Sequence, residues 1–137
     1  MILVCVTDQE SCGRLIEAGR KLADLSDTLL KVICVRPRNM KNWFGSDEVE
    51  FLFNKAKQLD AEMIIKFHDY AVDAVSDCIR ANDIDVVVVG MPPVTGHSVF
   101  ISGIEENFPD LVVIALDDSG SLQYVPAIVE SNMDSSY

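Results

Sequence analysis

The residues best suited to chemistry follow the most apolar run of the chain, which spans positions 84 to 89 with Asp85 inside it. Gly90 ends that run, and Gly96, His97 and Ser98 stand a short loop later, where a helix-like segment begins. Backbone amides at a glycine turn and at the start of a helix, together with a serine hydroxyl, are groups that hold anions such as phosphate. The spacing therefore predicts either a turn that lines a site for a small anionic ligand or a tight turn that only joins the strand to the helix.

His97 has two readings at this turn. It is either an anion contact or base, or a solvated turn histidine. No neighbouring Cys, Asp or second His in the sequence completes a catalytic triad or a metal set, so we expect no catalysis and no metal. His68 lies in another turn between an apolar run and a helix pattern, and has the same two readings.

A second group of charged residues follows another apolar run. Arg36, Arg38 and Lys41 place three of the eleven cations within one short segment. These side chains are either contacts for an anionic ligand or solvated surface cations that balance the negative charge of an acidic surface. Both interpretations stay open from the sequence.

Apolar periodicity indicates which elements position these residues. Runs without a polar face predict buried parallel strands, and repeats at helical spacing predict helices between them. The predicted strands cover residues 2–6, 29–35, 61–67, 84–89 and 111–116, alternating with four helices. The pattern is that of an α/β fold, an open five-stranded parallel sheet with helices on both faces, Rossmann-like. In such a sheet ligands bind at the carboxyl ends of the strands, which is where both groups lie.

Composition limits the partners. The 137 residues carry 22 acidic and 11 basic side chains, a net charge of −11, which argues against nucleic acid and anionic membranes. No apolar stretch approaches the roughly 18 residues of a membrane span and no signal peptide is evident, so we expect a cytoplasmic location. The four cysteines lack C-x-x-C spacing, and we expect them to be reduced and unpaired.

Two stretches resemble the universal stress protein family, namely ILVCVTD at the start and HDYAVDAVSDCIRANDIDVVVVG before the central turn. VCVTDQESCGRLI is also similar to the stress-protein module of potassium-responsive sensor kinases. The resemblance covers residues 1–116 as one domain and leaves the acidic, serine-rich tail, 117–137, unmatched. It implies the strand order 3-2-1-4-5 and dimers that form through the last strand. It also implies ATP binding in one branch of the family but not in another.

The resemblance further implies where a nucleotide would sit, and the chain departs from the ATP-binding pattern there. Gly90 matches the first glycine of the phosphate loop, but Pro93 replaces the second and has no amide hydrogen to donate. Gly96, followed by His97 and Ser98, matches the last glycine, at the end of a shortened loop. A strict count would place Gly103 there instead, without a following hydroxyl.

The adenine side departs as well. Thr7 takes the place of the family's aspartate, Asp8 comes one position late, and Val35 stands where the family contacts the base. We therefore expect a regulatory, ligand-sensing domain with a degenerate nucleotide site and no catalysis of its own. The alternative is an ATP-binding or other adenine-nucleotide-binding stress protein with an unusual short loop. Enzymes of related adenine-nucleotide families need a signature loop or histidine motif after the first strand, which TDQESCG lacks.

The fifth predicted strand, LVVIAL, stands last in the expected strand order. An apolar strand at a sheet edge tends to recruit another chain, so we expect a homodimer through this strand. The apolar part of the tail, residues 124–129, either covers that edge or crosses to the partner.

Overall fold

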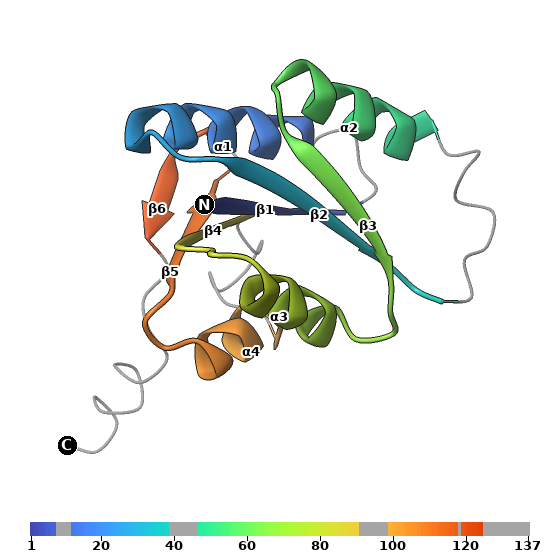
Figure 1. The fold of residues 1–137 in the computed structure, drawn as a ribbon, viewed down its shortest axis with the longest axis vertical. Helices are drawn as coiled ribbons and strands as arrows, with labels where there is room; N and C mark the ends of the chain where they lie inside the picture. The colour runs from blue at the N-terminus through green and yellow to red at the C-terminus, as the bar shows by residue number, and fades with distance from the viewer. Residues whose placement is uncertain (8–11, 39–46, 91–98, 118, 125–137) are drawn as a thin grey trace.

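A computed structural model describes residues 1–7, 12–38, 47–90, 99–117 and 119–124 of the chain (Figure 1). Strands and helices alternate along it. In chain order they are β1 (Ile2–Val6), α1 (Gly13–Ser26), β2 (Leu30–Arg36), α2 (Asp47–Gln58), β3 (Glu62–Phe67), α3 (Ala71–Ala81), β4 (Val86–Gly90), α4 (Val99–Asn107), β5 (Val112–Leu116) and β6 (Leu122–Tyr124).

One sheet carries all of these strands, in the order β3-β2-β1-β4-β5-β6. The first five strands run parallel, which confirms the predicted α/β class and the order 3-2-1-4-5. β1 lies between β2 and β4, so the strand order reverses beside it. This reversal places the carboxyl ends of β1 and β4 at the point where open α/β sheets bind ligands.

Two layers of helices cover the sheet. Figure 1 shows α1 and α2 on one face and α3 and α4 on the other. The alternation of side chains along each strand divides the core in the same way. Val4 and Val88 join the core beneath α1 and α2, whereas Leu3 and Val87 join the core against α3 and α4. All four of these side chains are fully buried, which explains why their strands have no polar alternation.

Gly19 lets α1 lie close to the sheet. A Cβ atom at this position would overlap the side chain of Val4 and come within 3.0 Å of Leu30 Cδ1. Both neighbours belong to strands and are buried, so neither can move aside easily. The glycine is therefore required by the packing distance between α1 and β1, as expected for a small residue in a helix that covers a sheet.

The sixth strand corrects one prediction. β6 pairs antiparallel with β5, so β5 is not the bare edge of the sheet that the sequence suggested. Asp117 makes the turn between them: its Oδ1 accepts hydrogen bonds from the Ser119 amide (3.0 Å), the Ser119 hydroxyl (2.7 Å) and the Ser121 amide (2.9 Å). Gln123 Nε2 donates to Oδ2 at 2.7 Å. The Asp117 amide also donates to the Ser121 carbonyl at 3.0 Å, and Gly120 has a positive φ of 90° in the same turn. Polar residues and a glycine thus make the reversal, which an analysis of apolar patterns does not detect.

The tail therefore contributes to the fold. Tyr124 is the last residue of β6, and the rest of the predicted apolar stretch, 125–129, lies outside the described residues. Of the two roles proposed for this stretch, the part that is described covers the edge of β5. The division of the chain at residue 116 stays a prediction, since β6 joins the same sheet.

Candidate functional site

The parallel register brings three of the predicted site residues to one edge of the sheet. Val6 pairs with Cys34, so the next residues, Thr7 and Val35, lie side by side at the carboxyl ends of β1 and β2. Gly90 ends β4 on the other side of β1. Neighbouring strands are about 4.8 Å apart, and these residues therefore lie within about 10 Å of one another across the sheet.

Gly90 leaves space at this edge. Among the described residues, the nearest atom to a Cβ built on Gly90 is Leu15 Cδ1, at an ordinary contact distance of 3.9 Å. The residue is exposed, and its backbone does not have the positive φ that favours glycine. The described structure thus shows no packing or conformational need for glycine here, in contrast to Gly19. A ligand that approaches the end of the central strand closely would supply such a need.

Thr7 has a neighbour that the sequence did not suggest. Its hydroxyl lies 3.4 Å from the Sγ atom of Cys12, the residue before α1. Cys12, the N-cap residue of α1, makes no side-chain cap hydrogen bond, and among the described residues Thr7 contacts the helix start through sulfur. The result is a hydroxyl and a thiol together at the carboxyl end of β1. No spacing motif links the two residues, which is why sequence reasoning missed the pair.

The predicted cations separate at the end of β2. Arg36 is the last residue of that strand and is 9% exposed, which is unusual for an arginine. Arg38 is exposed beyond it, and Lys41 lies outside the described residues. Of the two described cations, Arg36 is the one that belongs to a strand at the carboxyl edge.

His68 acts as a structural residue in the adjoining turn. Its backbone amide donates to the Arg36 carbonyl at 2.9 Å, and its Nδ1 accepts a hydrogen bond from the Tyr70 amide, also at 2.9 Å. Its ring meets that of Tyr70 edge to face, with centroids 6.1 Å apart. The Arg38 amide also reaches Asp69 Oδ1, at 3.4 Å. These contacts tie the ends of β2 and β3 together and support the reading of His68 as a turn residue.

The remaining members of the predicted site, Asp8, Gly96, His97, Ser98 and Lys41, lie outside the described residues, as does Pro93. Within the described part of the chain, no three His, Cys, Asp or Glu side chains are placed to share a metal ion. No helix there is both long and apolar enough to cross a membrane.

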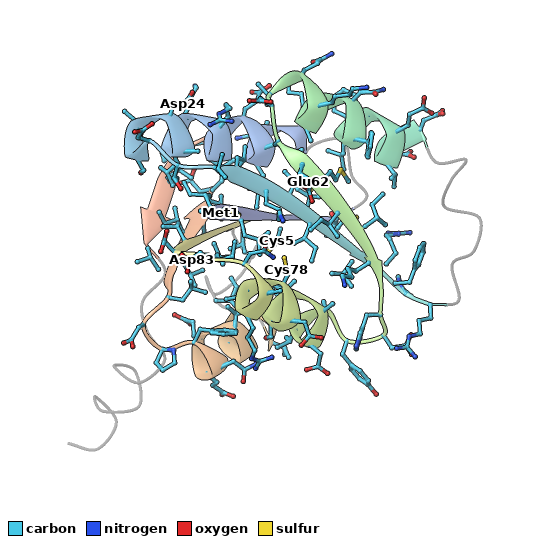
Figure 2. All side chains as sticks on the ribbon, in the orientation of Figure 1. Met1, Cys5, Asp24, Glu62, Cys78 and Asp83 are labelled. Atoms are coloured by element: carbon cyan, nitrogen blue, oxygen red, sulfur yellow. The ribbon has the colours of Figure 1, made fainter. Side chains whose placement is uncertain are left out.

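The cysteines fall on both faces of the sheet, and no disulfide joins the four, all of which are described. Cys34 belongs to the core under α1 and α2. Cys5 on β1 and Cys78 on α3 belong to the opposite core, and both are labelled in Figure 2. Burial raises the pKa of the Cys5 thiol to about 12, and the neighbouring Cys78 adds to the shift. Burial also raises the pKa of Cys78. These thiols are therefore neutral packing groups rather than nucleophiles.

Comparison with solved structures reveals the same arrangement in other proteins. A universal stress protein from Archaeoglobus fulgidus superimposes with a TM-score of 0.64 at 15% identity, over 83% of this chain and 90% of that one. A universal stress protein in complex with cAMP superimposes with a TM-score of 0.62 at 15% identity, over 83% and 94%. This chain has the universal stress protein fold. The resemblance seen in ILVCVTD and in the stretch before the central turn is thus confirmed as a likeness of fold.

A third structure extends the likeness beyond that group. N,N'-diacetylchitobiose deacetylase from Pyrococcus horikoshii superimposes with a TM-score of 0.51 at 9% identity, over 98% of this chain and 67% of that one. No protein-family model matches the sequence, and no curated protein matches it either. At these identities the comparisons establish the fold, and the ligand has to be argued from the site.

Proposed function

We propose that this universal stress protein-like domain is a cytoplasmic regulatory module that senses a small nucleotide at the carboxyl edge of its sheet and carries out no catalysis. The observation that carries the proposal is Gly90. It is an exposed glycine at the end of the central strand, without a packing or conformational need among the described residues. Its place beside Thr7, at the reversal of strand order, is where this class of sheet binds ligands.

Charge favours a ligand with a single phosphate. Among the described residues, the predicted cations near this edge are the buried Arg36 and the exposed Arg38, and the protein as a whole carries a net charge of −11. A triphosphate would bring several negative charges into that field, and Pro93 supplies no amide for them. A structural neighbour was solved with cAMP, whose phosphodiester carries one charge. We therefore propose an adenine mononucleotide, cAMP or AMP, and a site that is degenerate toward ATP.

Calorimetry with cAMP, AMP and ATP at one ionic strength tests this proposal. We expect binding of a mononucleotide, weak or no binding of millimolar ATP, and no release of phosphate from ATP. Gly90→Val should abolish binding, because its side chain fills the space at the strand end. Ala81→Val, an exposed substitution at the end of α3, adds similar bulk and should leave binding unchanged.

Two results would refute parts of this reading. Micromolar ATP affinity that is lost in Gly90→Val would assign the chain to the alternative, an ATP-binding protein with a short loop. Absence of binding for all three nucleotides would remove the sensing function itself. Unfolding of each variant by urea shows that a loss of binding is not a loss of fold.

We also propose that the functional unit is a homodimer. The bare fifth strand that first suggested a dimer is covered by β6, whose three residues pair with Ile114, Ala115 and Leu116. A dimer through β5 would have to form beside or in place of β6. The homodimer thus stays a prediction, and its surface has to be sought elsewhere on the sheet.

A further inference from the structure

β3 is the outer strand at the end of the sheet opposite β6. It is longer than β6, and Figure 1 shows it at the margin of the sheet between the two helix layers. Among the described strands only β2 pairs with it. Met63, Ile64 and Ile65 along this strand are partly exposed. An apolar edge of this length is a site for pairing with another strand.

The direction of the backbone groups shows what β3 offers. The His68 amide, just past the strand, points to β2, where it donates to the Arg36 carbonyl. Backbone groups alternate along a strand, so the N–H and C=O groups of Met63 and Ile65 point the other way, toward the outer edge. These four groups are the ladder that a further strand would use.

The charged side chains of β3 favour a second copy of the same strand as its partner. Glu62 and Lys66 lie on the same face of the strand with Ile64 midway between them. If a second β3 runs antiparallel about a two-fold axis at Ile64, each Glu62 lies directly opposite Lys66 of the other copy. The same register sets Met63 opposite Ile65, so that the outward N–H and C=O groups pair. β3 is thus complementary to itself, as a two-fold interface requires.

α2 repeats this complementarity on its own face of the sheet. Phe51 faces α1, since its ring lies 3.2 Å from a Cβ built on Gly13. Phe53 lies about 200° further round the helix, on the flank away from α1, and is 47% exposed. Glu50 and Lys57 share that flank, three residues before and four residues after Phe53. Two antiparallel copies of α2 would bring Phe53 to Phe53 and each Glu50 to Lys57.

α2 and β3 belong to the same margin of the molecule. α2 is the helix between β2 and β3 in the chain and packs on β3. Pairing of two β3 strands therefore also brings the two copies of α2 next to each other on their shared face of the joined sheet.

We propose that β3 and the outer flank of α2 form a two-fold interface with a second copy of this chain. The two sheets join there into one continuous sheet. This inference rests on the proposed homodimer and names its surface. The charged ends of β3 set the register of the pair, while Ile64 and Phe53 lie near the axis.

Sedimentation equilibrium of a charge-reversal cycle tests the interface. Glu62→Lys places like charges opposite each other twice in the dimer and should weaken it about ten-fold, and Lys66→Glu should do the same. The double variant restores two opposite-charge pairs and should recover most of the affinity. Glu62 also lies 3.6 Å from Lys31 within the chain, and the double variant does not restore that contact, so recovery reports the contact between copies.

Glu106→Lys, an exposed position on α4, is the matched control for net charge. It reduces the net negative charge as Glu62→Lys does, and should leave the dimer unchanged or slightly tighter. A dimer that is equally stable in all the variants would overturn this interface and keep the proposed homodimer. The mass of a single chain at high micromolar concentration would overturn both, while leaving nucleotide binding untouched.

Discussion

Replacement of Gly19 by alanine tests the close packing of α1 on β1. The new methyl group would overlap Val4 and press on Leu30 Cδ1 at 3.0 Å. Val4 is fully buried and β-branched, so relief requires a shift of the helix or strand. Overpacking costs about 1–3 kcal/mol, and an overlap with an immobile buried side chain belongs to the upper part of that range, about 2–3 kcal/mol, whereas alanine in place of glycine favours a helix by about 1 kcal/mol. The net expectation is a loss of about 1–2 kcal/mol in the free energy of unfolding.

Urea denaturation followed by circular dichroism measures this loss. The midpoint should fall with an unchanged m-value, and Tm should fall by roughly 3–8 °C. Gly13→Ala in the same helix is the matched control. Its added methyl group would meet the ring of Phe51 at 3.2 Å, and that ring is 42% exposed and free to turn. If Gly19→Ala proves as stable as the wild type, or if Gly13→Ala costs as much, the packing argument is refuted.

Two further predictions concern ionisable groups. Hydrogen bonds to the Asp117 carboxylate, first that from the Ser119 hydroxyl, hold the pKa of Asp117 below its ordinary value. These bonds therefore contribute fully to the stability of the folded protein above about pH 4, and the contribution is lost as pH falls through the lowered pKa of the folded state. Amide protection of β6, corrected for intrinsic exchange, should therefore fall at acid pH and at all pH values in Asp117→Ala; unchanged protection in that variant would contradict the role of Asp117. The Cys5 thiol, with its pKa raised to about 12, should resist alkylation at pH 8 in the folded protein, and the stability of the protein should decline as pH rises from about 9 toward 12. All four thiols should react after unfolding in urea; fewer, without added oxidant, would mean that a disulfide had formed.

The sequence predicted the parallel part of the fold because a strand that is buried on both faces has an uninterrupted run of apolar residues. β1 and β4 read as uninterrupted apolar runs, and their central residues are fully buried. β3 gave a weaker signal since it includes Glu62 and Lys66, and it lies at the margin of the sheet. The predicted strand ends differ from the observed ends by a residue or two. The second strand, for example, was predicted to end at residue 35, whereas β2 ends at Arg36.

β6 was missed because it is three residues long and its sequence, LQY, has no apolar run. The turn before it does carry a local signal. Asp117, Ser119 and Gly120 are turn residues, and Gly120 has a φ of 90° there. The contact of Thr7 with Cys12 was missed as well, because no spacing motif links the two residues. The placement of Val35 and Gly90 at one edge followed from topology alone, since parallel strands end together.

The position of β1 also affects how the chain folds during synthesis. One side of β1 can pair with β2 early, but the other side pairs with β4, which is made much later. At about 5–20 residues per second, the ribosome needs several seconds to deliver Val86–Gly90 after the first strand has emerged. Throughout that interval one edge of β1, an entirely apolar strand, lacks its partner. A nascent chain of this design is a natural substrate for chaperones that bind short apolar segments.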